Sequence, residues 1–485
     1  MPTRKLVAAG LSVMLAVMIP GCGKQDKPAM PAASAAADRG ASPSGSPAEL
    51  ALHRRAVEAV IWGMPAVNFD LMVQAAIANG AKPNQLIYWS KPVNWKDQTL
   101  TPNPDTIYLN PFYDTREGPV VIEVPPVTDG QVIVGSIDEA WQNALVDVGP
   151  AGADKGKGGK YLITPPGYKG KPPAGYTVLQ GTTYQGFAIL RSNFKTRSDA
   201  DVAAAVEHGK RIKVYPLSAG PSASVAVDVY DKPFDSTIQY DWRFFESLHR
   251  FIQVEPWATR DKVMIEMLKS LGIEKGKPFA PDDKTKAVFE AAAREAHEYI
   301  SLRFEKMYDE PFWQGTHWAV PVPPETLADM QDGFSNPDVY ALDGRAIMYH
   351  MAYFSAKQLG QGQFYVFAIH DNQGRRLDGR KTYKLTVPAN APVQQYWSAT
   401  MYDADTHALI RETSHSSRAS TAPDLKPNAD GSVTIYFGPK APDGQDGNFV
   451  PTNDRPWEVI FRLYGPDKSF FEKAWQLPDI EPVAG

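Results

Sequence analysis

The chain has 485 residues, of which 43% are hydrophobic and 22% are charged, a composition typical of folded rather than disordered proteins. Its 50 basic and 55 acidic residues give a net charge of −5. This balance argues against nucleic acid as the main partner, because nucleic acid requires a basic face. The single cysteine excludes disulfide bonds within the chain and thiolate zinc clusters.

The N-terminal residues predict a signal peptide over residues 1–21. Arg4 and Lys5 precede an apolar run over residues 6–19, which has the length of a signal-peptide core and is too short to span a membrane. The run ends in Ile-Pro-Gly-Cys at residues 19–22, which resembles the processing site of bacterial lipoproteins. The resemblance implies that Cys22 is lipidated and anchors the chain in the bacterial cell envelope, at the outer membrane and facing the periplasm. The alternative is an ordinary secretory signal followed by an unrelated cysteine.

Residues 22–45 predict a flexible linker, because they are rich in Ala, Ser, Pro and Gly. A domain over residues 46–220 follows. It opens with a capping box at residues 46–49 and a helix that we expect Pro65 to end, with a second helix over about residues 69–78. Short apolar runs separated by Gly and Pro then predict an antiparallel β-sandwich, with strands over residues 119–124, 131–137, 141–148, 160–163, 176–180 and 187–191.

Residues 221–345 predict one strand and a helical insert. Val225, Val227 and Val229 alternate as in a half-buried strand, and apolar stripes at helical spacing follow over residues 244–251, 263–271 and 288–304. Strand periodicity returns in a C-terminal domain over residues 346–485, at residues 364–369, 383–387, 433–437 and 457–463. The sequence therefore predicts a mainly β, α+β protein in which two β-domains bracket a helical segment.

Six motifs, spread over both β-domains, resemble a bacterial two-domain family. They are Asn-Pro-Asp-Thr-Ile-Tyr at 103–108, Asp-Glu-Ala-Trp-Gln-Asn at 138–143, Tyr-Leu-Ile-Thr-Pro-Pro-Gly-Tyr at 161–168, Val-Tyr-Pro-Leu-Ser at 214–218, Tyr-Trp-Ser-Ala-Thr-Met-Tyr-Asp at 396–403 and Arg-Leu-Tyr-Gly-Pro at 462–466. The chain resembles proteins in which domain of unknown function 1254 precedes domain of unknown function 1214. The resemblance implies an immunoglobulin-like sandwich first, a helical insert, and a jelly-roll-like C-terminal domain. It implies no agreed activity.

Asp105 and Tyr108 form the predicted catalytic pair. They lie where a proline-rich loop enters a strand. An Asp held by loop donors can act as a general base, and a nearby Tyr can donate to a developing negative charge. Asn-Pro-Asp is also a strong turn sequence, so a structural role for Asp105 is the alternative.

Four further residues are predicted to bind a ligand. Trp141 and Asn143 offer an aromatic wall and an amide, as a sugar or planar ligand requires, and a buried core role for Trp141 is the alternative. Tyr402 begins a segment at a strand end with two carboxylates and an imidazole, for which a hairpin turn is the alternative to a ligand site. Arg462 lies on the strand face opposite its apolar neighbours and is suited either to bidentate binding of a carboxylate or to a structural salt bridge. We predict no metal ligands, and the sequence identifies no cofactor.

The sequence contains no nucleophile elbow, phosphate-binding loop or zinc-protease motif. We therefore expect a cell-envelope lipoprotein that binds a glycan or another small polar molecule in a cleft between its β-domains. Two alternatives stay open. One is a hydrolase or lyase that acts on a polar, glycan-like substrate through the Asp–Tyr pair, and the other is an envelope scaffold that self-assembles into oligomers. The expected partners are the membrane, through the lipid anchor, and a small ligand, but not nucleic acid.

Overall fold

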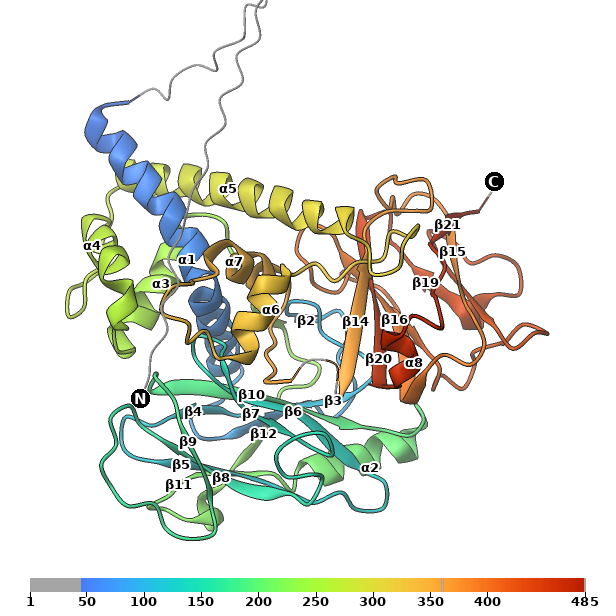
Figure 1. Cartoon of the computed structure of the whole chain (residues 1–485), viewed down its shortest axis with the longest axis horizontal. Helices are drawn as coiled ribbons and strands as arrows, with labels where there is room; N and C mark the ends of the chain where they lie inside the picture. Colours follow the sequence, from blue (N-terminus) through green and yellow to red (C-terminus); the bar gives the residue numbers. More distant parts are fainter. Residues whose placement is uncertain (1–44, 359, 361, 484–485) are drawn as a thin grey trace, which may run out of the picture. The chain divides into compact units, whose positions relative to one another are not determined.

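The computed structural model describes residues 45–358, 360 and 362–483 of the chain. The expected signal segment, Cys22 and nearly all of the expected linker lie outside the described residues. Two β-sandwiches and a group of helices make up the described part (Figure 1). The predicted mainly β, α+β class is therefore confirmed.

The N-terminal sandwich is built from two sheets (Figure 1). The strands of the first, which we call the N-sheet, are β1 (Leu86–Tyr88), β3 (Ile107–Leu109), β4 (Phe112–Asp114), β6 (Val132–Glu139), β7 (Ala144–Val148), β10 (Gln185–Asn193) and β12 (Ala226–Asp228). Their order is β12-β1-β3-β10-β6-β7, and β4 pairs with β10 beside this path. The second sheet has the order β11-β5-β8-β9 and contains β5 (Val120–Val124), β8 (Gly159–Thr164), β9 (Thr177–Gln180) and β11 (Lys213–Pro216). Aliphatic side chains of both sheets form the core between them.

The C-terminal sandwich also has two sheets. The strands of the first, which we call the C-sheet, are β14 (Gln363–Ala368), β16 (Val393–Asp403), β17 (Ser417–Ala419) and β20 (Trp457–Pro466), in the order β14-β20-β16-β17. The second contains β15 (Tyr383–Val387), β18 (Val433–Gly438), β19 (Phe449–Pro451) and β21 (Glu481–Pro482), in the order β19-β18-β15-β21. A separate hydrophobic core fills this sandwich.

The helices are α1 (Pro47–Ala78), α2 (Asp199–Gly209), α3 (Trp242–Val254), α4 (Lys262–Ser270), α5 (Asp283–Lys306), α6 (Pro324–Gln331), α7 (Leu342–Met351) and α8 (Lys468–Phe471). Short 3-10 turns are η1 (Pro221–Ala223), η2 (Thr259–Asp261), η3 (Met307–Asp309) and η4 (Asp446–Asn448), and β2 (Asp97–Gln98) pairs with β13 (Phe234–Asp235). α1 packs against α3, α5 and α7 (Figure 1). By length and composition α1 could cross a membrane, but 78% of its most apolar window is buried in the protein, as in the core helix of a globular protein.

The expectation that Pro65 ends the first helix is wrong. α1 continues through Pro65 to Ala78, and all residues from 59 to 70 are buried. An interior proline costs about 3 kcal/mol, because it removes one hydrogen bond and clashes with the preceding turn. Burial of a whole helical segment outweighs this cost. In addition, the carbonyl of Pro65 accepts a hydrogen bond from the Gln142 amide at 2.9 Å.

The expected strand over residues 141–148 begins later than predicted. Its first part is a turn, because Gln142 takes a positive φ of 60° that no strand accommodates, and β7 begins only at Ala144. The apolar character of Trp141 therefore reflects burial in a turn and not a strand.

Alternation along the strands places a third core outside both sandwiches. Ala188 and Leu190 of β10 face the core of the N-terminal sandwich, whereas Ile189 faces the helices. In the same way Phe461 of β20 faces the core of the C-terminal sandwich, whereas Ile460 joins the helix-facing core. Because side chains alternate along a strand, the residues two positions after Ile189 and Ile460 face this shared side as well.

Candidate functional site

A cavity of about 320 Å³ lies where the outer faces of the N-sheet and the C-sheet meet α6 and α7. Small-molecule sites occur preferentially at domain interfaces, and this volume is at the lower end of the usual range of about 300–1,000 Å³. Side chains from four parts of the fold line it: Tyr108, Ile189 and Arg191 from the N-sheet, Phe364, Tyr365, Phe367, Ile460 and Arg462 from the C-sheet, Leu327, Met348 and Met351 from the helices, and Asp97, Leu100 and Thr101 from the chain before β3.

Each sheet contributes one arginine with a tyrosine beside it. Arg191 of β10 is opposite Tyr108 of β3 in the antiparallel register, and its guanidinium lies 5.3 Å from the centre of that ring. Arg462 of β20 is opposite Tyr365 of β14, with 5.1 Å between guanidinium and ring. A cation over an aromatic face is stabilised by about 2 kcal/mol when the pair is desolvated. The two sheets therefore present the same cation–tyrosine pair to one cavity.

Neither guanidinium forms an ion pair with a carboxylate in the described part of the chain. Arg191 is 4% exposed and Arg462 is 2% exposed. Arg462 donates one hydrogen bond, to the carbonyl of Thr101 at 2.9 Å, while its Nε and Nη1 and the Nε of Arg191 have no partner. Buried charges are normally paired, because removing an ion from water costs several kcal/mol.

Arg345, a third buried arginine, also has a buried Nε without a partner, but it forms more hydrogen bonds than the cavity arginines do. It donates to the Tyr340 hydroxyl at 2.7 Å and to the Trp141 carbonyl at 3.1 Å, and its guanidinium lies against the Phe334 ring at 4.7 Å. It does not line the cavity. The surroundings of Arg345 are those of a structural arginine, which sets Arg191 apart.

The two cavity arginines act on the same tyrosine. Burial, followed by the neighbouring Tyr464 hydroxyl, raises the pKa of Tyr365 well above its usual value, although the positive charges of Arg191 and Arg462 both oppose this shift. Both positive charges therefore act on Tyr365, which lines the same cavity.

Asp97 is the acid among the described residues that line the cavity. The indole of Trp89 donates to its Oδ1 at 2.6 Å, and the backbone N–H of Asn94 donates to its Oδ2 at 3.0 Å. Burial outweighs these hydrogen bonds and raises the pKa of Asp97 to about 6. A carboxyl group with such a pKa can exchange a proton near neutral pH.

The loop that carries Asp105 joins the two β-domains. Asn103 donates to the hydroxyls of Tyr396 at 3.0 Å and Tyr464 at 2.9 Å, both in the C-sheet. The buried Asp105 accepts a hydrogen bond from Ser417 at 2.5 Å and pairs with Arg197 at 3.3 Å. Asp105 is not among the cavity-lining residues, so these contacts give it a structural use. Its catalytic role stays a prediction that the geometry does not favour.

The other predicted site residues divide between the cavity and the core. Tyr108 and Arg462 line the cavity, and Tyr402 is next to it, with its hydroxyl bonded to the Pro102 carbonyl at 2.6 Å and its ring 5.5 Å from the Arg462 guanidinium. Trp141 lies elsewhere, packed edge-on against other aromatic rings, and Asn143 donates to Glu139 at 2.5 Å. Their role as ligand-binding residues stays a prediction. The structure thus brings three of the six predicted site residues together at the cavity, namely Tyr108, Tyr402 and Arg462.

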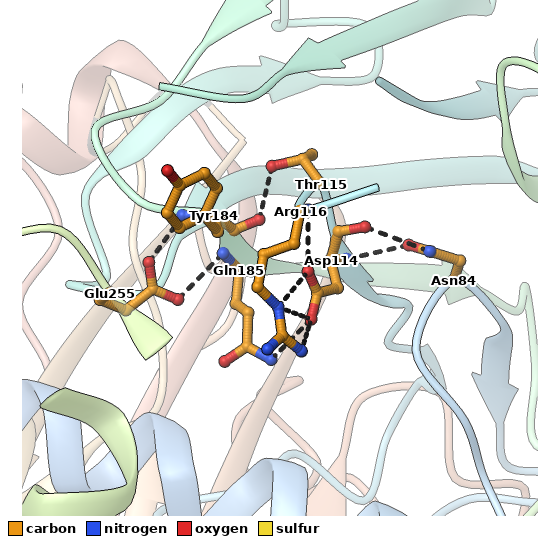
Figure 2. Close-up of polar contacts among 7 residues, drawn as sticks. All are labelled: Asn84, Asp114, Thr115, Arg116, Tyr184, Gln185 and Glu255. Carbon is orange, nitrogen blue, oxygen red and sulfur yellow. Dashed lines mark hydrogen bonds and ion pairs between the residues drawn. The ribbon is translucent and has the colours of Figure 1, made fainter. Parts of the chain in front are cut away.

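A second polar cluster surrounds Glu255, at the end of α3 (Figure 2). Its carboxylate accepts from the backbone N–H groups of Tyr184 at 2.6 Å and Gln185 at 3.0 Å. Burial, opposed by these hydrogen bonds and assisted by the negative charge of Asp114, raises the pKa of Glu255 to about 8. Asp114 is itself paired with Arg116 at 2.6 Å (Figure 2). The cluster joins α3 to the chain entering β10, a structural function.

Arg191 is the site residue that sequence reasoning missed. It ends the apolar run at residues 187–191, and Arg462 in the same way lies within the largely apolar strand β20. A charged residue within a buried strand is the signal that identifies Arg462, and the same signal identifies Arg191. Asp97 and Tyr365 carry no comparable signal, because each lies in a short segment whose neighbours are also polar or aromatic.

Comparison with known families identifies the two domains. Residues 83–216 match the family described as protein of unknown function DUF1254, and residues 362–468 match protein of unknown function DUF1214. The chain therefore contains a DUF1254 domain followed by a DUF1214 domain. The DUF1254 match contains Tyr108 and Arg191, and the DUF1214 match contains Tyr365 and Arg462, so each family domain supplies one half of the cavity's polar end.

The fold is similar to that of a solved structure. The crystal structure of the VPA0106 protein from Vibrio parahaemolyticus has a TM-score of 0.54 and 20% sequence identity, and the match covers 89% of this chain and 100% of that chain. An uncharacterized protein from Burkholderia cenocepacia matches with a TM-score of 0.41 and 11% identity over 90% of this chain and 94% of that chain. No curated protein matches the sequence.

Proposed function

We propose that this DUF1254–DUF1214 protein binds a small organic anion in the cavity between its β-domains. The observation that carries the proposal is the pair of buried guanidiniums, Arg191 and Arg462, which line one cavity without an ion-pair partner in the described residues. An anion would supply an opposite charge and accept hydrogen bonds from guanidinium groups that line the cavity. Two buried cations without an ion pair at one cavity are typical of a functional site.

The arrangement also predicts what binding does to the protein. One guanidinium belongs to the N-sheet and the other to the C-sheet, so one anion would contact both domains at once. A ligand that binds only the folded state stabilises it by about 2.7 kcal/mol at one hundred times Kd. An anionic ligand should therefore raise the melting temperature of the protein.

A thermal-shift panel tests the proposal directly. Benzoate, octanoate, succinate and phosphate are compared with the neutral analogues benzyl alcohol and octanol, on the purified wild type and on Arg191→Met. The matched control is Arg345→Met, which removes a buried arginine outside the cavity. We expect at least one anion to raise the melting temperature of the wild type and of the control but not of Arg191→Met. Equal shifts with the neutral analogues, or no shift with any anion, would contradict the proposal.

For the alternative of a hydrolase or lyase, Asp97 is a better candidate than Asp105 for the proton-transfer group, because Asp97 lines the cavity and Asp105 does not. Asp97 and Tyr108 line the cavity, and a pKa of about 6 suits Asp97 to accept or donate a proton. We propose this hydrolase or lyase function as the second candidate. Asp97→Asn should then abolish conversion of a bound anion, followed by mass spectrometry, while the anion still raises the melting temperature. Release of every bound anion unchanged by the wild type would remove this candidate.

The place of the protein in the cell is proposed from the N-terminal segment. Cleavage before Cys22 and lipidation of its thiol would leave the folded body tethered to the membrane by a linker, as the Ile-Pro-Gly-Cys sequence suggests. Membrane fractionation of cells expressing the wild type or Cys22→Ala tests this proposal. The wild type should be found in the membrane fraction with an incorporated labelled fatty acid, and Cys22→Ala should lose both. Self-assembly, the remaining prediction, is tested by light scattering on the same preparations.

A further inference from the structure

We infer that the anion is a monocarboxylate with an apolar body, a class set by the charges and the walls of the cavity. This inference rests on the proposed function, because it assumes that an anion binds between Arg191 and Arg462. It goes further in assigning the number of charges on the ligand, the kind of charged group, and the character of the remainder.

The charge of the cavity suits one anionic group. Arg191 and Arg462 are the cations among the described residues that line it, each beside a tyrosine that also lines it. A second anionic group on the ligand would have to sit among apolar side chains, where an unpaired ion costs several kcal/mol. Asp97, the lining acid, would repel it further when ionised. Dianions with separated charges are therefore disfavoured.

The geometry of the cationic groups suits a planar head group. A guanidinium presents its N–H donors as a flat fork that matches the two oxygens of a carboxylate. Arg462 keeps Nε and Nη1 free while its Nη2 is used on the Thr101 carbonyl, and Arg191 keeps its Nε free. A monoanion also loses less hydration energy than a phosphate dianion on entering an enclosed site, so we assign a carboxylate.

Most of the remaining cavity wall is apolar, although Asn110, Gln331 and Gln363 also line it. Val93, Leu100 and Val322 line it together with Leu327, Met348 and Met351. Methionines adapt to ligands of different shape, because their side chains are unbranched and polarisable. Burial of apolar ligand surface here contributes about 25 cal/mol per Å². A cavity of about 320 Å³ limits the body to a short aliphatic chain or a single small ring system.

Calorimetric titration of the purified protein tests this class of ligand. Octanoate is compared with octanedioate, which adds a second carboxylate, with octyl phosphate, which changes the head group, and with acetate, which lacks the body. Octanoate should bind at least about tenfold more tightly than each of the other three, a difference of at least about 1.4 kcal/mol. Benzoate serves as the aromatic counterpart and should also bind more tightly than acetate.

Variants separate the two ends of the cavity. Met348→Gln should weaken octanoate binding at least about fivefold and leave acetate binding nearly unchanged, whereas Arg191→Met should weaken both. If Met348→Gln does not fold, Leu327→Met tests the same apolar wall. This substitution keeps the volume and the apolar character of the side chain, so octanoate binding should be retained, and its loss would contradict the apolar contact.

The outcomes separate this inference from the proposed function. Tighter binding of octanedioate or acetate than of octanoate would overturn the apolar monocarboxylate but leave anion binding intact. Tighter binding of octyl phosphate would overturn the carboxylate head group alone. Failure of all these anions and of inorganic phosphate to bind would overturn both.

Discussion

Replacement of Arg191 by methionine should make the ligand-free protein more stable, although it removes a buried side chain. Arg191 is 4% exposed, and its desolvation costs several kcal/mol, about 5 as a working value. The Tyr108 ring at 5.3 Å returns about 2 kcal/mol, and no described carboxylate adds to this. Methionine fills a similar volume without a charge, so Arg191→Met should gain about 1–3 kcal/mol.

Arg462 gives the comparison that tests this reasoning. It has the same burial, but it lies against two rings, Tyr365 at 5.1 Å and Tyr402 at 5.5 Å, and donates a hydrogen bond to the Thr101 carbonyl. A hydrogen bond from a charged group contributes about 1.5–3 kcal/mol. Together with the two rings, this bond roughly offsets the free-energy cost of burying the Arg462 charge. Arg462→Met should therefore change the stability by less than about 1 kcal/mol, clearly less than Arg191→Met.

Urea unfolding, with and without octanoate, measures both effects. Without ligand, the midpoint should rise for Arg191→Met and stay nearly constant for Arg462→Met. With octanoate, the wild type should gain stability and both variants should lose most of that gain, because each removes one half of the anion site. A fall in the midpoint of Arg191→Met without ligand would refute the reasoning that its charge is uncompensated. A full response of this variant to octanoate would refute its place in the site.

The remaining predictions concern residues outside the cavity. The pKa of Glu255 is about 8 in the folded protein and 4.5 ordinarily, so the folded state favours its neutral form. Its contribution to stability is therefore complete below about pH 4.5 and is lost as the pH rises to about 8. Glu255→Gln should reduce the pH dependence of the free energy of unfolding in this window by up to about 1.4 kcal/mol per pH unit, and an unchanged slope would contradict this prediction. Asp105→Asn should lower the free energy of unfolding by about 1–3 kcal/mol and leave the response to octanoate unchanged, whereas loss of that response at full stability would restore its catalytic or binding role. Gly186→Ala should destabilise the protein by at least about 3 kcal/mol in urea, because its Cβ would lie 2.1 Å from the Tyr113 hydroxyl, whereas Gly362→Ala, with nothing within 4 Å, should be tolerated; equal effects of the two would show that the strands adjust.

Local sequence patterns predicted the elements of the fold well, because burial of one face of a strand or helix makes apolar residues recur at a regular spacing in the sequence. The stripe over residues 288–304 is α5, and the alternation at residues 457–463 is part of β20. Pro65 misled the prediction, because the packing that keeps α1 continuous involves Gln142 and other residues far away in the sequence. Local propensity carries no information about such contacts.

The candidate site was predicted only in part. Arg462 and Tyr108 were identified, since an arginine within a largely apolar strand and a tyrosine after a turn are visible in one segment. The cavity itself could not be foreseen, because its wall joins residues as distant as Asp97, Met348 and Arg462. Their convergence depends on how two sheets face each other, which alternation within either sheet leaves undetermined.

The loop from Thr101 to Asp105 has a consequence for how the molecule is made. Its amide, carbonyl and carboxylate groups find their partners at Tyr396, Tyr402, Ser417, Arg462 and Tyr464, which the ribosome adds about three hundred residues later. Until then these polar groups must stay hydrated, so the first half of the chain cannot reach its final arrangement by itself. Neither half is an interchangeable module: exchanging one for that of a distant relative would leave this loop without its matching surface, even where each sandwich folds.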